Sequence, residues 1–472
     1  MIHMKSVGQE LRCRARVAGC ARGLHPLLLV VALSNPGCAA ASEETSAVLL
    51  PKAMLAPPRA SAPTQHIALD SLSLRDAVGV AIARHPDIAR ANAEIAHGTA
   101  QVEVAKAAWY PRLDYGLRPG YGGSFGTDGN RAGTRASLGV SQLLYDFGRT
   151  SSRISAANAT LSQKTHAVAD AVESVAYQTA SGFIEMAAGQ EVIAAARRQV
   201  DALEQTRAKI HERMRAGLSL PSDGNLADLA LLRAQAAVVK AHTRLNVAAA
   251  KVNELMGVRP LGVQPLARTV ALVRDLGSDG SGDIEGTPAV LAAAAAVEAA
   301  DARVRLAQAE RFPSISVGVN RSLSTGRADV TNDRWIGLQL TGSFSFGGLA
   351  RHQSAAAQAE LRASRESLEN QRLVTRSALH AAEVEAEGAA ARREGYDKVV
   401  ALSRASRDLY WQEYMLNKRT LTDVVNPERD IYDAEVEMIN ALADGALARI
   451  KAYAAVGRLV TLLREHDGGR HE

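Results

Sequence analysis

The sequence predicts an α+β membrane protein made of two tandem repeats, each with one β-hairpin and long coiled-coil helices. Similar short stretches recur at an offset of about 200 residues, which is the mark of an internal repeat. Two segments without proline, 149–217 and 349–418, are long enough for unusually extended helices. Of the 19 aromatic residues, 11 fall within 109–147 and 312–346, around the expected strands. This clustering favours strands that cross a membrane.

The N-terminal 41 residues have the order of a secretory signal peptide. Basic residues precede the apolar run LLLVVAL at 27–33, and small residues follow, so cleavage is expected after Ala40 or Ala41. Lipid attachment at Cys38 is the lesser alternative. All three cysteines lie in this segment, so neither a disulfide nor a thiolate metal site is expected beyond it. Without residues 1–38 the chain has 50 basic and 49 acidic residues, which does not support a nucleic-acid partner.

The rest of the chain divides into a tether, two repeats and a linker. Residues 42–71 are rich in Pro, Ala and Ser without periodicity and are expected to form a tether. Repeat 1 is expected at 72–257, an inter-repeat linker at 258–287 and repeat 2 at 288–465. The matching stretches include WYPRLDYGLRPGYG with RFPSISVGVNRSLS, and AGLSLPSDGNL with LNKRTLTDVVN.

The expected strands are short and alternate in character. They span about 112–122, 134–147, 313–323 and 334–346. Alternation suits either a soluble sandwich or a membrane barrel wall, and the aromatic residues near the strand ends favour the membrane. On that reading Val317 and Leu338 face lipid, while Ser316 and Gln339 face the lumen.

Four helices are expected after the strands, two in each repeat. The long ones span 149–217 and 349–418, and the return helices span 222–257 and 421–463. Apolar residues recur every seventh position, which predicts left-handed supercoiling. One such series in the first long helix is Val172, Thr179, Met186, Ile193 and Val200, with Thr179 as its polar member.

The stretch LLYDFGRT raises the alternative that Asp146 is a metal ligand, because Asp-Phe-Gly occurs in protein kinases. The other kinase motifs are absent from the sequence, and Ser345 stands in place of Asp146 in the second repeat. We therefore interpret the stretch as a sharp strand-to-helix turn that Gly148 permits, with Gly347 and Gly348 at the matching place. No catalytic residue, cofactor or metal site is expected, and the chain is not predicted to be an enzyme.

Four strands cannot close a membrane barrel, because the smallest single-chain barrels have about eight strands. Open strand edges are not tolerated in lipid, so the sequence predicts an oligomer.

The sequence resembles the TolC-like outer-membrane factors over about residues 72–460. LSLRDAVGVAIARHPDIARANAEI, QLLYDFGRTSSRISAAN and NKRTLTDVVNPERDIYDAEVEMINA carry the resemblance. It implies a homotrimer in the outer membrane with one trimeric 12-stranded barrel and a periplasmic α-helical tunnel, the linker 258–287 forming its equatorial region.

The resemblance also implies the function of a passive exit duct in a tripartite export system. The implied partners are a periplasmic adaptor (membrane fusion protein) and an inner-membrane ABC exporter or proton-driven pump. The sequence is most similar to the branch that exports an adenylate cyclase-haemolysin toxin, so type I secretion, such as cyclolysin export, is expected. A multidrug efflux channel is the alternative, and a soluble periplasmic coiled-coil adaptor is a distant one.

The family's periplasmic gate places five residues at the helix turns. By resemblance, Tyr414 and Arg419 correspond to latch residues with Asp223 as their partner, and Asp423 corresponds to an outer acidic ring. Asn426 takes the inner ring position, where well-known members have Asp. The alternative for Asp223 and Asp423 is a helix-capping role, because both begin a helix.

Overall fold

The computed structural model describes residues 72–121, 132–260, 262–276, 283–325 and 330–468. The expected signal peptide (1–41) and tether (42–71) lie outside these residues. The described chain is mostly helical with one small antiparallel sheet. In chain order it contains α1 (Leu74–Arg84), α2 (Pro86–Lys106), η2 (Ala107–Trp109), β1 (Arg112–Tyr121), β2 (Ala132–Tyr145), α3 (Arg149–Arg215), α4 (Pro221–Met256), α5 (Leu266–Asp275), η4 (Ile284–Gly286), α6 (Pro288–Ala309), β3 (Ser314–Thr325), β4 (Val330–Thr341), α7 (Leu349–Met415), α8 (Leu421–Ala455) and α9 (Leu459–Gly468).

The four strands form one sheet in the order β1-β2-β3-β4, with every neighbour antiparallel. Within the described residues, β1 and β4 are therefore the edges. The register pairs Val317 with Leu338 and Ser316 with Gln339. Each pair shares a face, since directly opposite residues of a sheet point the same way.

One face of the sheet carries most of its apolar side chains, and they are exposed. Tyr115, Ile336 and Leu338 expose 84%, 77% and 69% of their surface. On the other face the Trp335 ring lies over two glycines, because a Cβ built on Gly318 would come within 3.0 Å of it and one on Gly337 within 3.1 Å. Trp335 thus covers backbone on the polar face and does not belong to the apolar face, where an aromatic girdle would lie.

Strand β4 ends at Thr341, five residues before the expected end at 346. Its last partner is Ser314. Pro313 immediately precedes β3 and has no N–H to donate, so the ladder of hydrogen bonds between β3 and β4 stops at Ser314. Phe344 and Phe346 follow outside the sheet, and Phe346 is 98% exposed.

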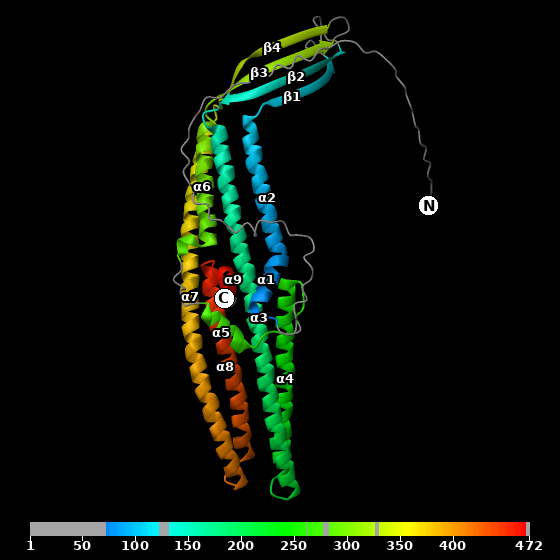
Figure 1. The fold of residues 1–472 in the computed structure, drawn as a ribbon, viewed down its shortest axis with the longest axis vertical. Helices are drawn as coiled ribbons and strands as arrows, with labels where there is room; N and C mark the ends of the chain where they lie inside the picture. Colours follow the sequence, from blue (N-terminus) through cyan, green and yellow to red (C-terminus); the bar gives the residue numbers. More distant parts are fainter. Residues whose placement is uncertain (1–71, 122–131, 261, 277–282, 326–329, 469–472) are drawn as a thin grey trace, which may run out of the picture. The chain divides into compact units, whose positions relative to one another are not determined.

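Helices α3 and α7 have 67 residues each and are the next elements in the chain after β2 and β4 (Figure 1). Helix α3 packs against α2, α4, α6 and α8, whereas α7 packs against α6 and α8. The expected heptad series of α3 is buried from Val172 to Ile193, and its last member, Val200, is partly buried. Gly182 permits close approach of α4, because a Cβ there would lie 3.0 Å from Val252 Cγ2.

The structure corrects one expectation for the repeats and adds a helix to the linker. The return helix 421–463 is not continuous: α8 ends at Ala455 and α9 begins at Leu459. Gly457 lies between them at φ 69°, and a Cβ there would be 2.3 Å from Pro288 Cδ, so a left-handed glycine breaks the helix. The expected linker 258–287 contains the helix α5, which packs against α8.

No helix among the described residues has the length and hydropathy needed to cross a membrane.

Candidate functional site

The strand-to-helix turn of LLYDFGRT is a helix cap. Asp146 is buried, and its Oδ2 accepts a hydrogen bond of 2.7 Å from the Thr150 amide. Gly148 at φ 86° is the N-cap residue of α3, and Gly348 at φ 69° is that of α7. The adjacent Phe147 also has a positive φ of 56°. The Asp146 carboxylate therefore accepts a hydrogen bond from an amide that the start of α3 leaves unpaired. Among the described residues, no group of three or more His, Cys, Asp or Glu side chains is arranged to hold a metal ion.

The turns α3–α4 and α7–α8 repeat the same construction at the ends of the helix pairs. Gly217 at φ 72° and Asn417 at φ 56° provide the left-handed residue in each turn. Asp223 and Asp423 are the third residues of α4 and α8, and their carboxylates accept hydrogen bonds from the backbone amides of the N-cap residues Leu220 and Thr420 at 3.4 and 3.1 Å. The repeat seen in the sequence therefore extends to the conformation of these two turns.

Tyr414 joins the two turns. Its side chain is 5% exposed and packs with Ile210 of α3, Ala227 of α4 and Leu421 of α8. Its hydroxyl lies 3.0 Å from Ser219 Oγ and donates to Asp223 Oδ2 at 3.4 Å. The expected partnership between Tyr414 and Asp223 is therefore present within one chain.

Arg213 also joins the turns, although sequence reasoning did not single it out. Its guanidinium donates to Ser219 Oγ at 3.3 Å in the first turn and to Asn417 Oδ1 at 3.2 Å in the second. It lies 5.2 Å from the centre of the Tyr414 ring, within cation–π range. In the sequence Arg213 is one basic residue among several near the end of a helix, and only its position opposite the second turn distinguishes it.

Arg419 does not contact Asp223 within the chain, so the expected pairing of these two residues stays a prediction. Its Nε donates to Glu413 Oε2 at 2.8 Å, and its guanidinium lies 4.3 Å from the Tyr410 ring centre. The hydrogen bond with Glu413 raises the pKa of Arg419 above its ordinary value. The side chain folds back along α7 because a carboxylate and an aromatic ring lie nearer to it than the first turn.

Asp423 caps α8. Its Oδ2 accepts from the Thr420 hydroxyl at 2.8 Å as well as from the Thr420 amide, and these bonds lower the pKa of the carboxyl. Asn426 is exposed one turn further along. The capping alternative thus has a geometric basis, and the ring assignments of Asp423 and Asn426 remain predictions.

A second link between the helix pairs lies further along α8. Glu435 is 4% exposed and accepts from Arg198 of α3 at 2.7 Å and from Arg404 of α7 at 2.5 Å. One heptad earlier, Glu428 lies 3.6 Å from Arg407, and burial raises the pKa of its carboxyl. Both carboxylates interrupt an otherwise apolar contact, and Glu435 connects three helices.

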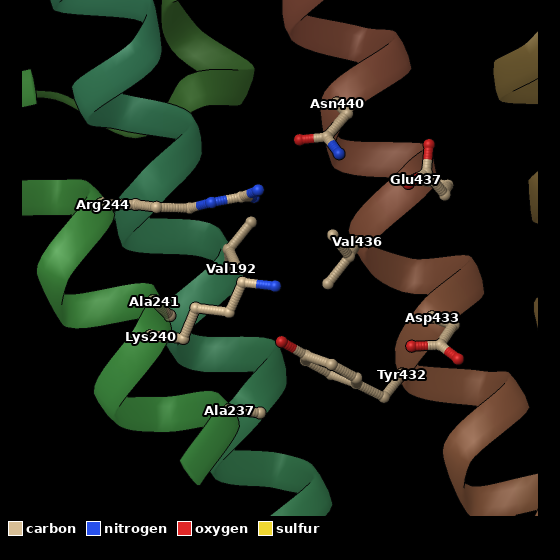
Figure 2. Close-up of a pocket in the computed structure, with 10 residues that line it drawn as sticks. All are labelled: Val192, Ala237, Lys240, Ala241, Arg244, Tyr432, Asp433, Val436, Glu437 and Asn440. Atoms are coloured by element: carbon tan, nitrogen blue, oxygen red, sulfur yellow. The ribbon is translucent and has the colours of Figure 1, made fainter.

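A groove of about 280 Å³ lies between α4 and α8, with α3 as its floor. Figure 2 shows Lys240 and Arg244 extending from α4 towards α8, which presents Asp433 and Glu437. Among the described residues, no ion pair of 4.0 Å or less joins these two walls. The groove therefore has walls of opposite charge that do not neutralise each other.

Comparison with solved structures identifies the fold. CusC, whose reported structures concern transmembrane channel formation, superimposes with a TM-score of 0.70 at 15% identity, over 81% of this chain and 91% of CusC. This chain therefore has the same fold as CusC, with a small sheet and long helices.

The family follows from the sequence. The profile of the outer membrane efflux protein family matches residues 77–258 and 284–458, which is more than half of the 472 residues. The chain belongs to the outer membrane efflux protein family, and its location is the outer membrane. This confirms the TolC-like resemblance; members of the family are channels and not enzymes.

Two relatives have similar sequences over most of their length. Protein CyaE of Bordetella pertussis is 26% identical over 326 residues, which cover 66% of this chain and 68% of CyaE. The outer membrane efflux protein BepC of Brucella suis is 22% identical over 370 residues, covering 76% of this chain and 79% of BepC.

Proposed function

We propose that this protein is a passive exit duct of a tripartite export system and that three copies close one 12-stranded barrel. The observation that carries the proposal is the four-stranded sheet, which has two unpaired edges and an exposed apolar face in a protein of the outer membrane. Pairing β4 of one chain with β1 of the next removes both edges. Repeating this contact closes a ring, as head-to-tail interfaces do when their rotation allows it.

The long helices support the same arrangement. Leu232 and Val239 of α4 are seven residues apart and are 63% and 67% exposed. Leu402 and Leu409 of α7 have the same spacing and are 69% and 59% exposed. Since α4 packs mainly on α3 and α7 mainly on α8 and α6, these stripes lie on the outer helices of the chain. A neighbouring chain that joins one stripe to the other would continue the coiled-coil packing.

The trimer is expected to resist dissociation in mild detergent, because separating the chains would expose two strand edges each to an apolar environment. Light scattering of the purified protein measures its mass, and cross-linking counts the chains. A monodisperse monomer with an intact sheet would contradict the proposal.

The faces of the barrel wall give a second prediction. Val317 and Leu338 are expected to face lipid, and Ser316 and Gln339 the lumen. All three native cysteines lie in the expected signal peptide, so the mature protein is expected to contain none. Cysteines introduced by Ser316→Cys and Gln339→Cys should react with a water-soluble thiol reagent. Val317→Cys and Leu338→Cys serve as the matched positions, and equal reaction at all four would show that the faces are wrongly assigned.

For the cargo, we propose protein export by a type I system, on the similarity to CyaE and to the toxin-exporting branch. Small-molecule efflux is the second candidate, and the similarity to BepC, an efflux protein by name, favours it. A strain without the gene distinguishes the two. Loss of a secreted polypeptide with unchanged drug tolerance supports protein export, and the opposite pattern supports efflux.

The groove between α4 and α8 is proposed to receive the periplasmic adaptor, which links the duct to an ABC exporter or a proton-driven pump. A helical hairpin with both charge signs would pair with the unneutralised walls. Lys240→Glu together with Arg244→Glu should weaken adaptor cross-linking while leaving the trimer intact. Arg233→Glu, an exposed position of the same helix outside the groove, is the control. Equal cross-linking in all three proteins would exclude this groove.

A further inference from the structure

Two arginines interrupt the apolar face of the sheet at the same level. Along β3 this face presents Ile315, Val317 and Val319 and then Arg321. The register places Leu340, Leu338 and Ile336 of β4 opposite these three residues, and Arg334 opposite Arg321. Both strands therefore carry three apolar residues followed by an arginine.

The pair lacks a neutralising charge. The described sheet residues that share this face include no Asp or Glu, since Asp114 and Asp333 pair with Gly139 and Ser322 on the other face. Arg321 Nε donates to the neutral Asn332 Oδ1 at 3.1 Å, and Arg334 has no hydrogen bond or ion pair within the described residues. Like charges directly opposite each other in a sheet are unfavourable, so a counter-ion would stabilise this arrangement.

The surroundings indicate where that counter-ion comes from. Leu138, the β2 neighbour of Arg321, is 54% exposed, and Val319 and Ile336 beside the pair are 50% and 77% exposed. From Ile315 to Arg321 the strand rises about 20 Å, or about 15 Å along the membrane normal at the usual barrel tilt. Long arginine side chains at this height extend towards the headgroup level, as basic side chains do at membrane boundaries.

We infer that Arg321 and Arg334 form a binding site for the phosphate of an anionic lipid headgroup, whose acyl chains lie against Leu138, Val319 and Ile336. Guanidinium groups bind phosphate oxygens through paired N–H donors, and two of them side by side fit one phosphate. The inference rests on the proposed function, because it requires this face of the sheet to contact lipid.

The test uses the full protein purified in a neutral detergent and titrated with lipid A, with bound lipid counted by native mass spectrometry. The expected loss of affinity is about fivefold for Arg321→Gln or Arg334→Gln and roughly 25-fold for the double variant. Parallel titrations use phosphatidylcholine, which is zwitterionic, and inorganic phosphate. Both are expected to bind much more weakly than lipid A.

Arg118→Gln is the matched control. Arg118 lies directly opposite Arg135, so it also belongs to a cross-strand arginine pair, but on the polar face. Its replacement should leave lipid A binding unchanged. The inference is overturned if the double variant binds lipid A as the unaltered protein does, if Arg118→Gln loses as much affinity, or if inorganic phosphate binds as tightly as lipid A.

Failure of the lipid-site inference can be distinguished from failure of the proposed trimeric duct. Each variant is first checked for trimers by cross-linking. If the double variant does not assemble, the lipid A titrations of the single variants decide the test. Trimers that bind lipid A independently of both arginines overturn this inference alone. A monomeric protein in which both arginines are needed for lipid A would overturn the duct and leave the lipid site standing.

Discussion

Replacement of Arg213 by Gln is expected to raise single-channel conductance in planar bilayers by shifting the duct towards an open state. Arg213 donates to Ser219 and Asn417 and so holds the two helix turns together. A half-exposed link of this kind contributes about 1 kcal/mol, and three symmetric copies contribute about 3 kcal/mol. That amount changes an open-to-closed ratio by about a hundredfold without unfolding the protein. Tyr414→Phe, which removes the hydroxyl contacts with Ser219 and Asp223, should act in the same direction.

Arg215→Gln is the matched control, because Arg215 lies on the same turn and donates only to the His211 carbonyl of its own helix. Its conductance should equal that of the unaltered protein. Asp423→Asn in the same recordings distinguishes the effect of pore charge from the effect of the contacts between the turns. Loss of an acidic ring should lower cation selectivity and leave the ratio of open to closed ducts unchanged. Unchanged conductance in both Arg213→Gln and Tyr414→Phe would mean that these contacts do not hold the duct closed.

The second large effect is expected when both arginines that bind Glu435 are removed. Arg198→Ala with Arg404→Ala leaves a carboxylate with a 6% exposed side chain and no partner in either neighbouring helix. An unpaired buried charge costs about 3–5 kcal/mol per chain. The midpoint of thermal unfolding, followed by the circular dichroism of the helices, should fall accordingly.

Glu435→Gln should be much milder, because it removes the buried charge and leaves two arginines that already reach water. Arg392→Ala is the control for an exposed pair, since Arg392 and Asp444 are both about half exposed, and it should cost at most about 1 kcal/mol. If the double arginine variant unfolds at the same temperature as Arg392→Ala, Glu435 does not depend on these partners.

The gate residues show how far a sequence comparison reaches. The resemblance to the TolC-like family pointed to Asp223, Tyr414 and Asp423 at the two matching turns of the repeat. The contact between Tyr414 and Asp223 is present, whereas Arg419 folds onto Glu413. Which of several charged neighbours a long side chain contacts depends on distances between helices, and the order of residues does not contain those distances.

The repeat, the alternating strands and the positions of the long helices follow from the sequence alone, because they depend on local periodicity and on the absence of proline. The sequence also indicated the family. Three features became visible only in the folded structure: β4 ends opposite Ser314, next to Pro313; Gly457 against Pro288 separates α8 from α9; and Glu435 joins α3 to α7. The structure likewise placed Arg213 between the two turns and Arg321 opposite Arg334. The helix contacts depend on residues far apart in the chain, and the arginine pair depends on the register of two strands, so none of them follows from local periodicity.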